Sequence, residues 1–140
     1  MNTKVAELMS ESVVTAEPHQ SVEHARQILE RNSISSLPVV DSEGQPVGVV
    51  SATDLAHDLK AGSPISKIMT EKVYVVPKYE DVSIAARIMR NHKIHHVVVT
   101  HEKKVVGILS AFDLLKLVEG HRYVEKNPPT KSARKRVKKN

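Results

Sequence analysis

The chain has no cysteine and no tryptophan, and aromatic residues make up only 3% of it. Without cysteine, disulfide bonds and thiolate metal sites are excluded, and nothing in the composition indicates an oxidising compartment. No apolar run approaches the roughly 20 residues of a membrane-spanning helix. Residues 1–10 lack the basic start and apolar centre of a signal peptide. We therefore expect a soluble, cytoplasmic protein with no membrane partner.

Positive charge is concentrated at the C-terminal end. The net charge is +5, but residues 121–140 contain eight Lys or Arg and one acid, so the first 120 residues are slightly negative. Pro128 and Pro129 prevent a preceding helix from continuing, and the like charges repel one another. We expect residues 121–140 to form a disordered basic tail that makes at most weak contact with nucleic-acid phosphates.

One eight-residue phrase occurs twice in the chain. Residues 48–55 read GVVSATDL and residues 107–114 read GILSAFDL. The repeat continues upstream, where MSESV at 9–13 corresponds to MTEKV at 69–73 with an offset of 60. Two units of about 60 residues are too long and too few for a solenoid and indicate a pseudo-twofold pair. The predicted organisation is a first repeat at 1–62, a second repeat at 63–120 and the tail at 121–140.

Each repeat is predicted to contain a strand, a helix, two strands and a last helix. Ser21 is a good N-cap for a helix with apolar residues at helical spacing. A short turn containing Gly and Pro joins the next two strands into an antiparallel hairpin. In the first repeat we expect a strand at Val13–Thr15, a helix from Ser21, strands at Leu37–Val40 and Val47–Ser51, and a last helix from near Ala52. The hairpin strands of the second repeat are expected at Val97–Thr100 and Val105–Leu109.

The hairpin strands are continuously apolar rather than alternating, which indicates burial on both faces. One repeat has only enough helix to cover one face of its sheet, so the other repeat must cover the second face. We therefore predict an α+β fold in which the two repeats pack sheet to sheet with pseudo-twofold symmetry. Neither repeat should be stable alone.

The retained Gly, Ser and Asp of the phrase have a structural and a functional interpretation. Ser51 with Asp54, and Ser110 with Asp113, have the spacing of a capping box at a helix start. The glycine can allow another chain or a ligand to approach the strand closely. Free amides at a helix start suit a phosphate, and the carboxylate can accept hydrogen bonds from two vicinal hydroxyls. A ribose phosphate would satisfy the whole set, and capping can coexist with it.

Two such units, each ending in this phrase after a hairpin, resemble a tandem pair of cystathionine-β-synthase (CBS) domains, the Bateman module. The resemblance covers about residues 5–118 and implies a regulatory module with two clefts between the repeats. It implies a ligand such as AMP, ADP, ATP, S-adenosylmethionine or NAD. By resemblance, Asp54 and Asp113 hold ribose hydroxyls, and Ser51 and Ser110 lie near phosphate or ribose. Thr15 and Val75 would border the base.

The two repeats differ at positions that the resemblance assigns to phosphate. His95 and His96 of the second repeat are expected to face phosphates, whereas the first repeat has Ser35 and Ser36 there, of which Ser36 is also a candidate ligand contact. Phe112 also replaces the Thr of the first phrase, which could narrow one cleft. One functional site is therefore a safer expectation than two. Histidines without a carboxylate nearby in sequence give no good reason to expect a metal.

Two classes of function remain open from the sequence. The first is a stand-alone sensor that binds an adenosine nucleotide and signals to an unidentified protein effector, as a homodimer paired through Leu55–Leu59 and Leu114–Val118. The second is a nucleic-acid or ribosome-associated protein that binds through its basic tail, with the CBS pair as scaffold, and a purely structural dimer is a third reading. An enzyme is not expected, because neither Ser51 nor Ser110 has an evident His and acid partner.

Overall fold

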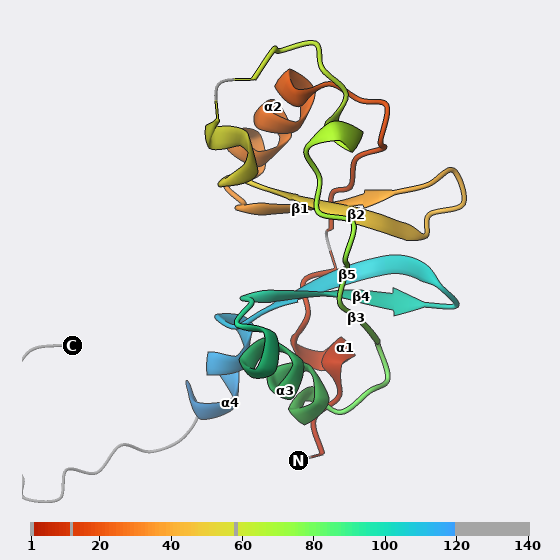
Figure 1. The fold of residues 1–140 in the computed structure, drawn as a ribbon. Coiled ribbons are helices and arrows are strands. Elements are labelled where there is room, and N and C mark those ends of the chain that lie inside the picture. Colours follow the sequence, from red (N-terminus) through yellow and green to blue (C-terminus); the bar gives the residue numbers. More distant parts are fainter. Residues whose placement is uncertain (1, 12, 58, 120–140) are drawn as a thin grey trace, which may run out of the picture.

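Two small sheets face each other across the centre of the molecule, and the main helices lie on their outer faces (Figure 1). The computed structural model describes residues 2–11, 13–57 and 59–119. The predicted basic tail at 121–140 lies outside this described part, so its disorder stays a prediction. In the part that is described, no helix has the length and apolar character needed to cross a membrane.

The first repeat consists of a two-stranded antiparallel sheet and one long helix. The helix begins after Ser21, whose Oγ accepts a hydrogen bond from the His24 amide at 3.0 Å, as predicted from the sequence. It ends at Ser33, which has a left-handed backbone with φ of 52°. The elements are α2 (Val22–Asn32), β1 (Ser36–Val40), β2 (Pro46–Ser51) and the 3₁₀ turn η1 (Asp54–Ala56).

The second repeat repeats this pattern with an additional strand. The strand β3 pairs in parallel with β4, and β4 pairs antiparallel with β5. Its long helix begins after Asp81, whose carboxylate accepts a hydrogen bond from the Ser83 amide at 2.9 Å. The elements are β3 (Val75–Pro77), α3 (Val82–His92), β4 (His96–His101), β5 (Lys104–Ser110), η3 (Asp113–Leu115) and α4 (Lys116–Glu119).

The predicted strand at Val13–Thr15 was wrong, because only Ala16 pairs, in a single parallel bridge to Val39. The second repeat explains the difference. There the Val98 amide donates to the Tyr74 carbonyl at 3.0 Å, which extends the pairing of β3. The position that corresponds to Val98 is Pro38, which has no N–H to donate. The first strand is therefore shortened by its partner rather than by its own sequence.

The predicted last helix from near Ala52 was wrong in the first repeat. In the first repeat it is the single 3₁₀ turn η1, after which His57 is extended. The guanidinium of Arg26 donates to the Leu55 carbonyl at 2.8 Å and occupies an acceptor that a continuing helix would use. In the second repeat η3 leads directly into α4, which reaches the end of the described residues. Within the candidate dimer segment Leu55–Leu59, the helical residues that the structure describes are Leu55 and Ala56 of η1, and the Leu55 side chain is buried.

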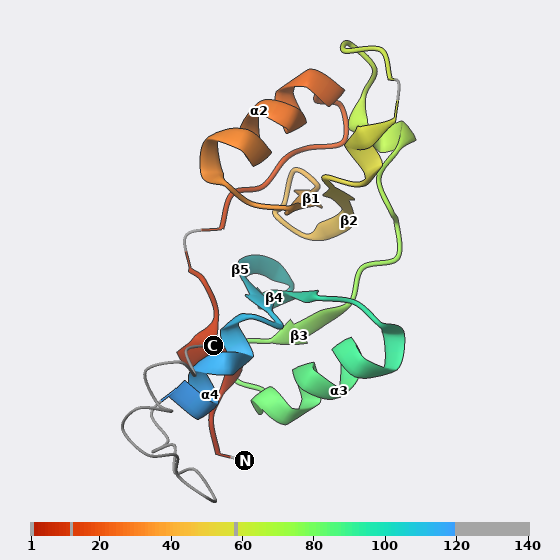
Figure 2. The ribbon, with the colours of Figure 1, turned by 90° about the vertical axis from the view of Figure 1, so that its left-hand side faces the viewer.

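Each repeat takes part of its hydrophobic core from the N-terminal segment of the other repeat. The short helix α1 (Val5–Leu8) buries its apolar side chains in the second core, with Val82 and Leu109. The 3₁₀ turn η2 (Ile65–Lys67) buries Ile65 in the first core. Figure 2 shows α1 beside the second sheet, and the chain then continuing upward to α2. This exchange supports the expectation that neither repeat is stable alone.

The glycine of each phrase lies where one of these exchanged segments crosses a strand. Thr70 pairs with Val49 through two hydrogen bonds of 2.9 Å, next to Gly48. A Cβ atom at Gly48 would lie 2.6 Å from the sulfur of Met69, and one at Gly107 would lie 2.8 Å from the Ser10 carbonyl oxygen. Close approach of another segment of the chain therefore accounts for both glycines.

Candidate functional site

The end of each phrase folds as a capping box, as its spacing predicted. The Ser51 amide donates to Asp54 Oδ2 at 2.9 Å, and the Asp54 amide donates to Ser51 Oγ at 3.1 Å. Ser110 and Asp113 form the same pair of bonds at 2.9 and 3.0 Å. The box fixes the backbone and leaves one carboxylate oxygen, Oδ1, available in each repeat.

The remaining carboxylate oxygen differs between the two repeats. Asp113 Oδ1 lies 3.5 Å from the ammonium of Lys116, with which it forms an ion pair. Asp54 Oδ1 has no hydrogen-bond or ion-pair partner among the residues that the structure describes. The carboxylate of the first repeat is therefore the one that is free to accept hydrogen bonds from a ligand.

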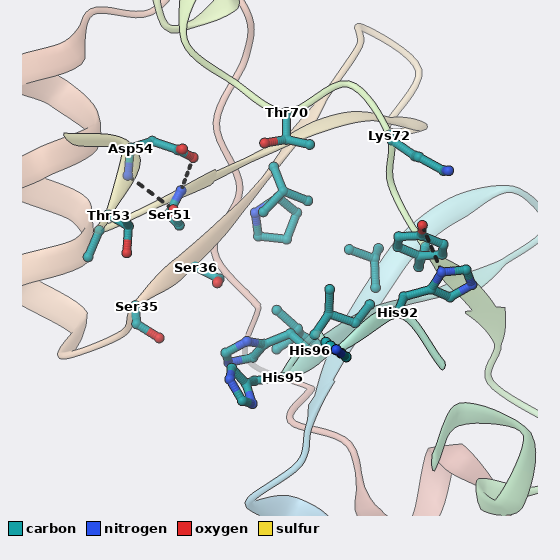
Figure 3. A pocket seen from close by; sticks show the side chains of 18 residues that line it. Ser35, Ser36, Ser51, Thr53, Asp54, Thr70, Lys72, His92, His95 and His96 are labelled. Carbon is teal, nitrogen blue, oxygen red and sulfur yellow. Dashed lines mark hydrogen bonds between the residues drawn. The ribbon is translucent and has the colours of Figure 1, made fainter. Parts of the chain in front are cut away.

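Asp54 faces a cleft of about 580 Å³ between the two sheets, which we call the first cleft. Figure 3 shows its labelled side chains arranged around an open space, with Asp54 and Ser51 on one side and Lys72 and His92 on the other. Both repeats contribute, and the second does so also through the segment that precedes β3. The lining residues are Ser35, Ser36, Pro38, Val49, Ser51–Asp54, Thr70, Lys72, Tyr74, His92–His96, Val98 and Ile108.

A second cleft of about 460 Å³ lies on the other side of the pseudo-twofold arrangement. It is built from the segment before α2 and from the end of that helix. These parts of the first repeat correspond to the parts of the second repeat that line the first cleft. Its lining residues are Ser10, Val13, Val14, Asn32–Ser36, Pro38, His96 and Ile108. Because Ser35, Ser36, Pro38, His96 and Ile108 line both clefts, the two clefts share a wall.

The structure brings five of the predicted site residues together and leaves four apart. Ser36, Ser51, Asp54, His95 and His96 line the first cleft. The remaining four line neither cleft: Thr15, Val75, Ser110 and Asp113. Val75 lies in β3 with its side chain 42% exposed. Contact of any of these nine residues with a ligand stays a prediction.

Sequence reasoning missed the cleft lining that comes from the segment before β3 and from the end of α3. Thr70 and Lys72 belong to the MTEKV segment, which marked the repeat but gave no reason to place it in a cleft. Tyr74 and His92 form a pair there, with the Tyr74 hydroxyl 3.1 Å from His92 Nδ1 and the rings stacked with centroids 4.2 Å apart. A comparison of each residue with its counterpart 60 positions away could have identified these lining residues from the sequence.

His96 lies in the wall that the two clefts share. Burial lowers the pKa of His96 below its ordinary value of 6.5, and the neighbouring His95 lowers it further, while Asp113 acts in the opposite direction. A neutral imidazole can donate one hydrogen bond and accept one. Among the described residues no three His, Asp or Glu side chains lie close enough together to hold a metal ion.

Residues 5–61 and 65–120 each match the family model of the CBS domain. The chain belongs to the CBS domain family. The match covers two copies, so residues 5–120 form a tandem CBS pair, and the predicted α+β CBS-pair fold is confirmed. Both the resemblance seen in the phrase and the sheet-to-sheet arrangement are thereby explained.

Solved CBS structures resemble this chain along most of its length. The CBS domain pair of protein MJ0100, in complex with 5′-methylthioadenosine and S-adenosyl-L-methionine, is 31% identical with a TM-score of 0.78. That match covers 87% of this chain and 100% of the other. The CBS domain protein PAE2072 from Pyrobaculum aerophilum, complexed with AMP, is 28% identical with a TM-score of 0.73. It covers 80% of this chain and 90% of the other.

Two curated relatives match this chain over only a small part of their own length. Inosine-5′-monophosphate dehydrogenase of Halobacterium salinarum is 34% identical over 75% of this chain and 22% of that protein. The uncharacterized protein MJ1404 of Methanocaldococcus jannaschii is 29% identical over 84% of this chain and 32% of that protein. The chain thus spans about a third or less of these two relatives, so their activities do not transfer to it.

Proposed function

We propose that this CBS pair is a regulatory module that binds an adenosine-containing compound in the first cleft and signals its occupancy to a protein partner. The observation that carries the proposal is the free carboxylate oxygen of Asp54, held by its capping box at the wall of a 580 Å³ cleft. Cavities of about 300 to 1,000 Å³ are the usual size for small-molecule sites. A fixed acceptor in such a cavity suits a ligand with neighbouring hydroxyl donors.

A ribose meets this requirement because its two vicinal hydroxyls can both donate to one carboxylate. Ser51 and Thr53 lie beside Asp54 in the cleft and add hydroxyl groups near the same point. The two solved relatives described above hold AMP, 5′-methylthioadenosine and S-adenosyl-L-methionine, which share the adenosine part. This common part supports an adenosine ligand here, with AMP, ADP or ATP as the principal candidates and NAD as a further one.

A catalytic role is not part of the proposal. The hydroxyls of Ser51 and Ser110 each accept the capping hydrogen bond from an Asp amide. Within the described part of the chain neither hydroxyl forms a hydrogen bond with a histidine that could act as its base. Binding and release of a ligand are therefore what this cleft is proposed to do.

A homodimer and a cytoplasmic location complete the proposal. Three apolar side chains from the N-cap of η3 to α4 are largely exposed, with Phe112 at 79%, Leu115 at 55% and Val118 at 61%. These residues adjoin or lie within the segment Leu114–Val118 that the sequence suggested for dimer contact. Exposed apolar side chains gathered on one short segment favour contact with another protein surface.

The test compares two variants. Asp54→Ala removes the capping box of the first repeat together with the free carboxylate oxygen, whereas Asp113→Ala removes the equivalent capping box of the second repeat and leaves Asp54 in place. Each substitution should cost the folded protein about 1 kcal/mol through loss of the cap. At a concentration about 100 times its dissociation constant, AMP should stabilise wild type and Asp113→Ala by about 2.7 kcal/mol. Asp54→Ala should show no such stabilisation. The measurement is the melting temperature with and without AMP, ADP, ATP and S-adenosyl-L-methionine.

Two results would reject the proposed function. One is a wild-type protein whose melting temperature responds to none of the adenosine compounds. The other is an Asp54→Ala variant that responds to every compound as wild type does.

A further inference from the structure

The two clefts differ in charge at positions that correspond through the pseudo-twofold arrangement. At four of these positions the second repeat presents a lysine or histidine to the first cleft, and the first repeat presents a serine or asparagine to the second cleft. The pairs are His92 with Asn32, Lys93 with Ser33, His95 with Ser35, and His96 with Ser36. A fifth lining residue of the first cleft, Lys72, corresponds in sequence to Ser12.

These residue differences determine the charge balance of the two clefts. The first cleft is lined by two permanently charged cations, Lys72 and Lys93, and by one acid, Asp54. Among the described residues that line the second cleft there is no lysine, arginine, aspartate or glutamate. The first cleft therefore carries an excess of positive charge, whereas the described lining of the second carries no permanently charged side chain.

The two lysines are available to a ligand. Within the described part of the chain neither Lys72 nor Lys93 forms a salt bridge. The ammonium of Lys72 lies 5.6 Å from the centre of the Tyr74 ring, which places it beside the cleft without neutralising it. Lys93 is the C-cap of α3 with φ of 55°, and its amide donates to the Met89 carbonyl. The end of the helix therefore fixes the backbone of Lys93 at the cleft.

The lysines and Asp54 come from different sides of the first cleft. Figure 3 shows Lys72 across the open space from Asp54, with His95 and His96 along a third side. A ligand that offers hydroxyl donors to Asp54 and negative charge elsewhere matches both features. Positive potential in a cleft with low-dielectric walls favours an anionic ligand over a neutral one of the same shape.

We propose that the first cleft selects phosphorylated adenosine compounds over neutral or cationic ones, through Lys72 and Lys93. This inference rests on the proposed function, because it assumes that the cleft binds adenosine at all. It adds a charge preference that separates the two clefts and that distinguishes AMP from adenosine and from the sulfonium compound S-adenosyl-L-methionine. The second cleft, without the lysines, has no such preference.

The test measures the affinity of the full chain for AMP, adenosine and S-adenosyl-L-methionine by calorimetry at low salt. AMP and adenosine differ only in the phosphate. Two exposed charge contacts predict that AMP binds about tenfold more tightly than adenosine. The preference should shrink as salt is raised, because ions screen exposed charges. S-adenosyl-L-methionine should bind no more tightly than adenosine.

The double variant Lys72→Gln with Lys93→Asn should lose most of the AMP preference and keep its affinity for adenosine. Asparagine is chosen at position 93 because it tolerates the left-handed backbone. The matched control is Lys67→Gln with Lys103→Asn. Lys103 also has a positive φ, at 71°, and neither control residue lines a cleft. The control should bind all three compounds as wild type does.

The outcomes separate this inference from the proposed function. Equal affinity of wild type for AMP and adenosine would overturn the charge selection while leaving adenosine binding intact. An unchanged AMP preference in the double variant, or an equal loss in the control, would overturn the role of the two lysines. Absence of binding of every compound would reject the proposed function and this inference with it.

Discussion

Replacement of Gly107 by alanine should destabilise the fold more than the same replacement at Gly48. Cβ atoms essentially never lie closer than 3.0 Å to an atom outside their own residue and its two chain neighbours. At Gly107 the added Cβ would lie 2.8 Å from the Ser10 carbonyl oxygen, which belongs to the backbone. At Gly48 the nearest backbone atom is the Thr70 carbonyl oxygen at 3.1 Å, and the shorter contact, at 2.6 Å, is to the flexible side chain of Met69.

The magnitude follows from what must move in each case. Ser10 is held to Ile108 by two hydrogen bonds of 3.0 and 3.2 Å, so displacing its carbonyl strains both. Met69 can instead turn to another rotamer. Overpacking a well-ordered region costs about 1 to 3 kcal/mol, and we expect Gly107→Ala near the upper end and Gly48→Ala near the lower end. At about 4 °C per kcal/mol, Gly107→Ala should lower the melting temperature by about 10 °C.

The assay is urea unfolding of the full chain, supported by thermal melting. Gly62→Ala is the control, because a Cβ atom there would meet nothing within 4 Å. It should change the free energy of unfolding by less than about 0.5 kcal/mol. A Gly107→Ala variant as stable as Gly62→Ala would refute the steric explanation of the phrase. So would a Gly48→Ala variant that is clearly less stable than Gly107→Ala.

Two further predictions concern His96 and the exposed apolar segment. Burial lowers the pKa of His96 below 6.5 in the folded state, so the stability that it contributes is present above pH 6.5 and is lost as the pH falls below it. Urea unfolding at pH 7.5 and 5.5 should therefore show a larger loss in wild type than in His96→Gln, and equal losses would contradict this. Phe112→Thr, which introduces the residue of the first repeat, should weaken the homodimer in light scattering, whereas Tyr79→Thr, also at an exposed aromatic, should not. A wild-type monomer at micromolar concentration would contradict the dimer.

Features that depend on a few neighbouring residues could be predicted from the sequence. The capping boxes, the N-caps at Ser21 and Asp81, and the hairpins each follow from side chains within a few positions of one another. The sheet-to-sheet arrangement also followed, because continuously apolar strands need cover on both faces. Local chemistry and burial therefore determine the architecture of each repeat.

Features that depend on a distant partner could not be predicted. The first strand is shortened because Pro38, more than twenty residues away, lacks an amide hydrogen. The last helix of the first repeat is cut short by Arg26, which binds the Leu55 carbonyl from another element. Lys72 and Lys93 reach one cleft only because the connecting segment and the end of α3 meet there. No sequence pattern within either segment predicts that the two segments lie together.

The exchange of core segments between the repeats determines how the molecule can open. Drawing the two sheets apart would pull Val5 and Leu8 away from the second core or Ile65 away from the first. The bridges from Ser10 to Ile108 and from Thr70 to Val49 would be broken in the same movement. Neither repeat can therefore melt while the other keeps a complete core, and the pair should behave as one cooperative unit in native-state hydrogen exchange. A ligand held at Thr70 and Lys72 would then slow exchange in β2 and β5 alike, including amides that it does not touch.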